Sequence, residues 1–354
     1  MGENKLNKAI VSMLISLTSI LLAFLIGGIV ILLLGKDPVA AYGALVKGAF
    51  GTPVAFTVSL SKAVPLILTG LAVAVAMKTR VFNIGAEGQL LMGAFAAAYV
   101  GITFTGIPAW LHVTLAIAAS AVAGALWALI AGVLKYARNV HVVISTIMLN
   151  YIATYLLQYF INGPFRDRET AISATRQIAD SSRLPLLLAK PLSLNAGFII
   201  ALVMIAAVYL LFRKTTTGYE MRAVGFNPSA SNVAGINVQK RMLLSLIISG
   251  ALAGIAGGIE ITGSMFRLVD GFSPGYGFNG IPVSLMAQGN PFAIFFSALL
   301  LGAMRNGALL MQIQVGVSQD IVGIVQGLVI IFIGCEYLIR HWYKKVFKGG
   351  GVVA

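Results

Sequence analysis

The stretch "AVPLILTGLAVAVAM" (Ala63–Met77) is followed almost directly by "RVFNIGAEGQLLMGAF" (Arg80–Phe95). The first stretch and "LLMGAFAAAYVG" (Leu90–Gly101) are both apolar enough to lie in lipid, yet an Asn, a Glu, a Gln and two Gly stand between them. A charged side chain at the bilayer centre costs about 2.5 kcal/mol or more. The polar residues are therefore expected near a membrane surface, where they cap and orient the start of a short second helix.

The composition of the whole chain indicates an integral membrane protein. Of its 354 residues, 58% are hydrophobic and only 10% are charged, whereas roughly a quarter of the residues in soluble domains are charged. A net charge of +14 would suggest nucleic acid as a partner of a soluble protein. Here the basic residues gather in short loops, which is the topology signal of membrane proteins, so the expected partner is the lipid bilayer. The single cysteine, Cys335, cannot form an internal disulfide.

Recurring apolar runs predict an all-α polytopic membrane protein with about ten membrane-spanning helices. The whole chain, residues 1–354, is interpreted as a single transmembrane domain in the cell membrane. The third and eighth expected spans are short and rich in Gly, as in broken helices that line a cavity. The expected spans are Val11–Leu34, Ser59–Met77, Gly88–Gly101, Leu111–Leu134, Val142–Ile161, Asn195–Phe212, Met242–Ile261, Asn279–Ala287, Pro291–Leu310 and Val317–Ile339.

The distribution of Lys and Arg predicts that both termini are cytoplasmic. With the N-terminus inside, more than half of the 25 basic residues fall in the expected cytoplasmic segments. Two loops are then long. Residues 162–194 form an extracytoplasmic loop of mixed charge that could hold a short helix or a docking surface, and residues 213–241 form a cytoplasmic loop.

The cytoplasmic loop carries its own helix signals. "TTTGYEMRAVG" is typical of a helix start, and in "NPSAS" Asn227 can cap a second helix with Pro228 at its first position. Gly235 then ends one or two helical turns. A short helix across such a loop can act as a docking element whose motion passes into the membrane domain. The alternative is an ordinary connecting loop.

Three phrases of the sequence resemble one family of transport proteins. "GYEMRAVGFNPSASNVAGINV" (Gly218–Val238) resembles the cytoplasmic coupling loop of ABC importer permeases of the branched-chain amino acid and simple-sugar class. "RVFNIGAEGQLLMGAF" resembles the nucleoside and simple-sugar branch of that class, and "GFSPGYGFNGIPVSLMAQGNP" (Gly271–Pro291) resembles its second Gly-rich region. The resemblance covers most of residues 59–340 and is strongest to purine-nucleoside permeases of Gram-positive bacteria.

The resemblance implies a single permease domain that moves nucleosides by alternating access. It implies three partners: a separate ABC ATPase, a second permease subunit in a heterodimer, and an extracytoplasmic substrate-binding lipoprotein. The chain contains no G-x-x-x-x-G-K-[ST] loop, so ATP is expected to bind another chain. No catalytic residue, metal or cofactor is expected here.

Three alternatives to the nucleoside importer remain open. A simple-sugar permease of the ribose or galactose type fits the same residues, because sugars also stack on aromatic rings. A stand-alone secondary transporter would need ion-coupling carboxylates, for which Glu260 and Asp320 are the candidates. A membrane enzyme would need a cluster of His, Asp or Glu at the membrane surface, and the sequence does not suggest one.

Two groups of site residues follow. The first is implied by the coupling motif, with Gly225–Gly235 as the docked segment: Arg222, Ala223, Gly225, Asn227, Pro228, Ala234 and Gly235. The second consists of polar and aromatic residues of the two Gly-rich regions and of the span 142–161, which suit a nucleoside but also suit helix–helix hydrogen bonding. These substrate-pathway candidates are Phe82, Asn83, Glu87, Gln89, Asn150, Tyr151, Asn279 and Ser284. For Glu87, pairing with Arg80 or capping of a helix is the structural alternative.

Overall fold

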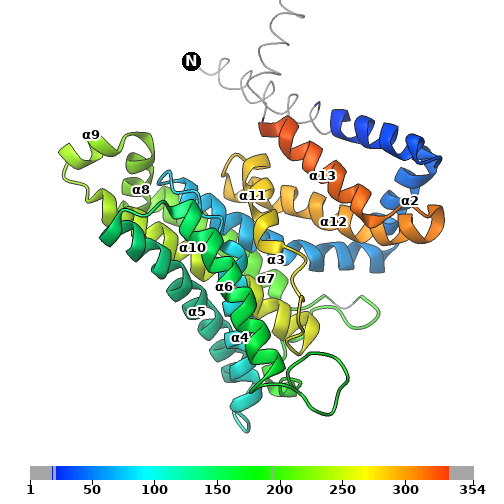
Figure 1. Ribbon diagram of the computed structural model, residues 1–354, viewed down its shortest axis with the longest axis horizontal. Coiled ribbons are helices and arrows are strands. Elements are labelled where there is room, and N and C mark those ends of the chain that lie inside the picture. Colours follow the sequence, from blue (N-terminus) through cyan, green and yellow to red (C-terminus); the bar gives the residue numbers. More distant parts are fainter. Residues whose placement is uncertain (1–17, 19–20, 193, 335–354) are drawn as a thin grey trace, which may run out of the picture. The chain divides into compact units, whose positions relative to one another are not determined.

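The computed structural model describes residues 18, 21–192 and 194–334, and this part of the chain is built from helices with no β-strand (Figure 1). Cys335, much of the expected span Val11–Leu34 and the end of the span Val317–Ile339 lie outside the described residues. The chain falls into two compact units. One comprises Thr57–Gly302 and the other comprises the residues up to Phe56 and from Ala303 onward. The expectation of a single domain stays a prediction.

Six helices in the described part are long and apolar enough to cross a membrane. Each corresponds to one of the spans expected from the apolar runs, which confirms an all-α, multi-pass membrane protein. The total of about ten spans and the cytoplasmic location of both termini stay predictions. The six helices are α3 (Pro53–Met77), α5 (Ala109–Arg138), α6 (Val142–Asn162), α7 (Gly197–Lys214), α10 (Val238–Glu260) continued by the π-helix η2 (Ile261–Met265), and α12 (Pro291–Val315).

The remaining helices are shorter. Helix α2 was not expected, although Asp37 and Pro38 carry its start signal: Oδ1 of Asp37 accepts a hydrogen bond from the N–H of Val39 at 2.8 Å. Its 13 residues are too few for a membrane span. The shorter helices are a helix over Leu21–Leu33, α2 (Pro38–Phe50), α4 (Ala86–Thr103), the 3₁₀-helix η1 (Asp180–Ser182), α8 (Thr216–Phe226), α9 (Pro228–Val233), α11 (Tyr276–Met286) and α13 (Gln319–Gly334).

Small residues hold α4, α5 and α10 together inside the Thr57–Gly302 unit. Gly250, Gly254 and Gly258 recur at every fourth position of α10 and form one face of the helix. A side chain at Gly250 would overlap the carbonyl oxygen of Gly124 on α5, and one at Gly258 would overlap Ser120. Small residues at this spacing let membrane helices approach until their backbones touch. These three helices are therefore the packed centre of the unit.

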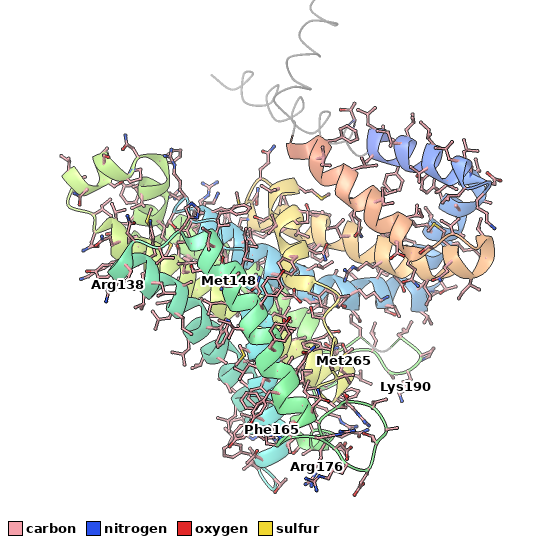
Figure 2. All side chains as sticks on the ribbon, in the orientation of Figure 1. Arg138, Met148, Phe165, Arg176, Lys190 and Met265 are labelled. Atoms are coloured by element: carbon pink, nitrogen blue, oxygen red, sulfur yellow. The ribbon has the colours of Figure 1, made fainter. Side chains whose placement is uncertain are left out.

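The expected extracytoplasmic loop, residues 162–194, lies against the ends of α4 and η2. The N–H of Ala179 donates to the carbonyl of Gly101 at 2.9 Å, and the N–H of Leu184 donates to the carbonyl of Thr262 at 2.8 Å. The 3₁₀-helix η1 confirms the short helix expected in this loop. Figure 2 labels Arg176 and Lys190 on this loop. Backbone hydrogen bonds thus attach the loop to α4 and η2.

In the unit formed by the residues up to Phe56 and from Ala303 onward, side chains donate hydrogen bonds to backbone carbonyls. The hydroxyl of Tyr42 on α2 donates to the carbonyl of Phe24 at 2.5 Å. The side-chain amide of Asn306 on α12 donates to the carbonyls of Gly48 and Ala55 at 3.0 and 2.8 Å. These bonds join α2 to the C-terminal half of α12.

Candidate functional site

The loop 213–241 folds as the sequence predicts, into two capped helices. The hydroxyl of Thr215 accepts a hydrogen bond from the N–H of Gly218 at 3.0 Å and begins α8. Oδ1 of Asn227 accepts one from the N–H of Ala230 at 3.1 Å, and Pro228 takes the first position of α9. Gly235, with φ +82°, follows the end of α9 in a conformation that glycine adopts easily.

Helix α8 packs against the C-terminal end of α3. A side chain at Gly225 would overlap the carbonyl oxygen of Lys78, so only glycine lets the two backbones approach this closely. Nη2 of Arg80 donates to the carbonyl of Phe226, the last residue of α8, at 3.0 Å. Arg80 itself has φ +59°, a conformation uncommon for residues other than glycine. The end of α3 is therefore attached to α8 at two points.

Helix α8 is also paired with α10. The carboxylate of Glu220 forms an ion pair with the guanidinium of Arg241 in the second turn of α10. Lys78 lies over the ring of Phe212, with Nζ 5.7 Å from its centroid. Burial, and then the positive charge of Arg222, lower the pKa of Lys78 below its usual value of 10.5. Helix α8 is therefore linked to α10 by an ion pair and lies close to the charged residue Lys78 at the end of α3.

The outer side of the α8–α9 pair presents apolar side chains. Phe226 is 82% exposed and Val233 is 91% exposed. Of the predicted coupling residues, Asn227, Ala234 and Gly235 are exposed, whereas Arg222, Ala223, Gly225 and Pro228 are partly buried. Sequence reasoning did not select Phe226 or Val233, although apolar residues in a polar loop are the signal that could have found them.

Buried amide side chains hold the segment before α4. Nδ2 of Asn83 donates to Oε1 of Gln89 at 3.0 Å and to Oγ of Ser249 at 2.8 Å, and its Oδ1 accepts the N–H of Gly85 at 2.9 Å. Asn83 and Gln89 are each 1% exposed. Residues 81–85 belong to no helix, and in a membrane the backbone groups of such a segment need partners from the protein. These amides supply some of them.

Asn150 of α6 supports the same segment. Its Oδ1 accepts the N–H of Gly88 at 2.9 Å, and its Nδ2 donates to the carbonyl of Ile84 at 3.0 Å. Three of the substrate-pathway candidates, Asn83, Gln89 and Asn150, thus converge on the start of α4. The hydrogen bonds described above join them to the protein itself, which is the arrangement expected of groups that fix a broken helix.

Glu87 caps a second helix rather than lying free in a channel. It is 7% exposed, and its Oε2 accepts the N–H of Gly277 in the first turn of α11 at 2.7 Å. A negative charge is favourable at a helix N-terminus. A side chain at Gly277 would overlap the backbone of Glu87, so the starts of α4 and α11 meet here. The two Gly-rich phrases of the sequence are therefore neighbours in space.

The other pathway candidates are dispersed. Tyr151 is 58% exposed on α6, and Phe82 is 38% exposed in a separate cavity of about 360 Å³ that Arg80 and Tyr136 also line. Nδ2 of Asn279 donates to the carbonyl of Gly275 at 2.6 Å, next to its own helix. Ser284 is buried, and its hydroxyl has no hydrogen-bond partner among the described residues. The candidates thus do not line one common cavity.

A larger cavity lies where α10 ends. Its volume is about 780 Å³, and Figure 2 labels two of its lining residues, Lys190 and Met265. None of the substrate-pathway candidates chosen from the sequence lines it. The signal that could have found it is Glu260, an ionisable residue inside a membrane helix, which the sequence analysis considered as an ion-coupling carboxylate. Six of the lining residues offer charge, amide or aromatic groups: Lys62, Arg183, Asn195, Glu260, Phe266 and Tyr276.

Comparison with known proteins agrees with this architecture. The helices define a multi-pass protein of the cell membrane, and residues 55–334 match the family described as "Branched-chain amino acid transport system / permease component". The chain belongs to this permease family.

Three relatives match over most of their length. The chain is 39% identical over 346 residues to the guanosine ABC transporter permease protein NupP of Bacillus subtilis, covering 97% of this chain and 99% of that protein. It is 34% identical over 342 residues to the nucleoside ABC transporter permease protein NupB of Lactococcus lactis, covering 94% and 93%. It is also 34% identical over 343 residues to the glucose ABC transporter permease protein TsgB13 of Haloferax volcanii, covering 94% and 90%.

Proposed function

We propose that this chain is the membrane-spanning subunit of an ATP-driven importer that carries nucleosides. Two full-length relatives named for guanosine or nucleoside transport support this substrate class. A simple sugar is the second candidate, because a glucose permease is similar over nearly the same length.

The observation that carries the proposal is the attachment of α8 to the end of α3. Force applied to the exposed α8–α9 pair would reach Lys78 through Gly225 and Arg80 through Phe226. From there the chain continues into residues 81–85 and α4, where the buried amides hold the broken helix. Movement of a docked ATPase would in this way tilt α4, and with it α11, between two arrangements.

The importer needs three further chains. A separate ATPase would dock on the apolar surface formed by Phe226 and Val233, because the chain lacks a phosphate-binding loop of its own. A second, different permease would complete the membrane channel. A substrate-binding lipoprotein would deliver the nucleoside at the opposite face.

Uptake by whole cells tests the proposal. A strain that lacks the gene for this chain is compared with the same strain carrying the gene, using radiolabelled guanosine and radiolabelled glucose. Uptake of guanosine is expected to depend on the gene and to stop when cellular ATP is depleted. Gene-dependent uptake of glucose alone would favour the sugar permease, and gene-dependent uptake that persists without ATP would contradict an ABC importer.

A further inference from the structure

The cavity at the end of α10 has the size and lining of a small-molecule site. Its volume of about 780 Å³ falls within the range of about 300–1,000 Å³ that ligand pockets occupy. Its walls come from α3, α10 with η2, the first residue of α11 and the loop 162–194, all within the Thr57–Gly302 unit. Tyr276 and Phe266 give it aromatic surface, on which a flat heterocycle can stack.

Glu260 is the buried charge of this cavity. It lies inside a membrane-spanning helix, is 9% exposed and ends the regular part of α10. The next five residues form a π-helix, and Phe266 follows with φ +59°. π-Helical turns and strained backbone both occur preferentially at functional sites. An ionisable side chain in the membrane, beside two such irregularities and on the wall of a cavity, marks this place as a candidate ligand site.

The opposite charge in the cavity is Lys62 of α3, which interacts electrostatically with Glu260. A carboxylate only accepts hydrogen bonds and an ammonium group only donates them. The Watson–Crick edge of a nucleobase carries a donor next to an acceptor, and proteins read single bases on that edge. A neutral base could thus hydrogen-bond to both charged groups at once without bringing a charge of its own into the membrane.

Two further residues shape the same cavity. The guanidinium of Arg183 lies 4.7 Å from the ring centroid of Phe266 and forms an ion pair with Asp180 at 2.9 Å. Its Nε is buried without a hydrogen-bond partner among the described residues. The amide of Asn195 donates to the carbonyl of Gly263 at 2.9 Å and thereby supports the π-helix.

We propose that this cavity is a nucleoside-binding site of the permease, in which Glu260 accepts a hydrogen bond from the base edge and Lys62 donates one to it. The inference rests on the proposed function, because it takes a nucleoside as the substrate. It adds the position of the site and the part of the substrate that is recognised.

Competition binding tests this inference. The complete transporter is purified without its binding protein, placed in lipid nanodiscs and loaded with radiolabelled guanosine. Inosine, 1-methylinosine and 2′-deoxyinosine then compete with the label. Methylation removes the N1–H that would donate a hydrogen bond to Glu260. We therefore expect 1-methylinosine to compete about 10- to 100-fold more weakly than inosine, because a hydrogen bond to a charged group is lost. 2′-Deoxyinosine is expected to compete as inosine does.

Variants assign the effect to the cavity. Glu260→Ala is expected to weaken competition by inosine to the level of 1-methylinosine, so that the difference between the two competitors disappears. Glu260→Gln keeps an acceptor and is expected to give an intermediate result. Lys62→Met is expected to weaken competition by both inosine and 1-methylinosine. Asp270→Asn removes an exposed carboxylate outside the cavity and serves as the matched control. If the Glu260 variants fail to assemble, the competitor series on the unaltered transporter decides.

Several results would overturn the inference. Equal competition by inosine and 1-methylinosine would exclude recognition of the base edge. A difference that survives Glu260→Ala would place that recognition elsewhere. Weaker competition by 2′-deoxyinosine than by inosine in the unaltered transporter, with no such difference in Glu260→Ala, would mean that the carboxylate binds ribose. Absence of guanosine binding alongside normal cellular uptake would refute this site alone, whereas absence of gene-dependent nucleoside uptake would refute the proposed function.

Discussion

Replacement of Gly225 by alanine is expected to separate ATP hydrolysis from transport. The new Cβ would overlap the carbonyl oxygen of Lys78 and lie 3.1 Å from its carbonyl carbon, well inside the usual carbon–carbon separation of about 3.5–4.0 Å. Since both neighbours are backbone atoms, α8 must move away from the end of α3. Overpacking of this kind costs about 1–3 kcal/mol. The equilibrium between attached and detached α8 would shift by about 5- to 150-fold.

The assay is simultaneous measurement of guanosine uptake and ATP hydrolysis by the complete transporter in proteoliposomes. Gly225→Ala is expected to lower the number of nucleosides moved per ATP at least about fivefold, the smaller of the shifts above, while the subunits still assemble. Gly323→Ala on α13 is the matched control, because nothing lies within 4 Å of the added Cβ. A Gly225→Ala transporter with the wild-type ratio, at equal amounts of assembled protein, would refute transmission through this contact.

Three further predictions concern the same region. Asn83→Ala leaves buried polar groups without partners, at about 1–3 kcal/mol for each, so thermal inactivation in detergent should begin at a clearly lower temperature; an unchanged temperature would contradict this. Glu87→Gln keeps an acceptor for Gly277 but removes the charge at the start of α11, so assembly should persist while uptake falls; uptake equal to wild type at equal expression would remove the gating role of the carboxylate. Burial and Arg222 lower the pKa of Lys78 from 10.5, so the folded state binds this proton less tightly than the unfolded state, and the free energy of unfolding should rise with pH from that lowered pKa up to about 10.5. Arg222→Gln should reduce this rise. A pH profile of stability that is the same in Arg222→Gln as in the wild type would count against the interaction of Arg222 with Lys78.

The parts of the fold that depend on local signals could be predicted from the sequence. The helix α9 needed only the cap of Asn227, the proline after it and the glycine that ends it. The six long spans needed only apolar runs of sufficient length. Each of these signals lies within one short segment, so no knowledge of packing was required.

The parts that depend on packing could not be predicted in the same way. Asn150 bonds Gly88 across 62 positions, and Asn83 bonds Ser249 across 166. Their residue types suited a substrate pathway, but only the fold reveals that each already has partners in the protein. The sequence analysis did not place Glu260 in a substrate site, because the cavity around it exists only after distant segments have packed.

Helix α2 was missed for a different reason. The search was for spans of about 20 apolar residues, and the 13 residues of α2 fall below that length. Asp37 and Pro38 form a local start signal that a search for caps would have recognised.

Identification of the chains that accompany this permease tests the central claim most directly. The tagged chain is purified from its native host in mild detergent, and the bound proteins are identified by mass spectrometry. The account predicts an ABC ATPase, a second and different permease, and a substrate-binding lipoprotein in the same complex. A chain that purifies alone and stable, and that transports nucleosides in liposomes without ATP, would contradict it.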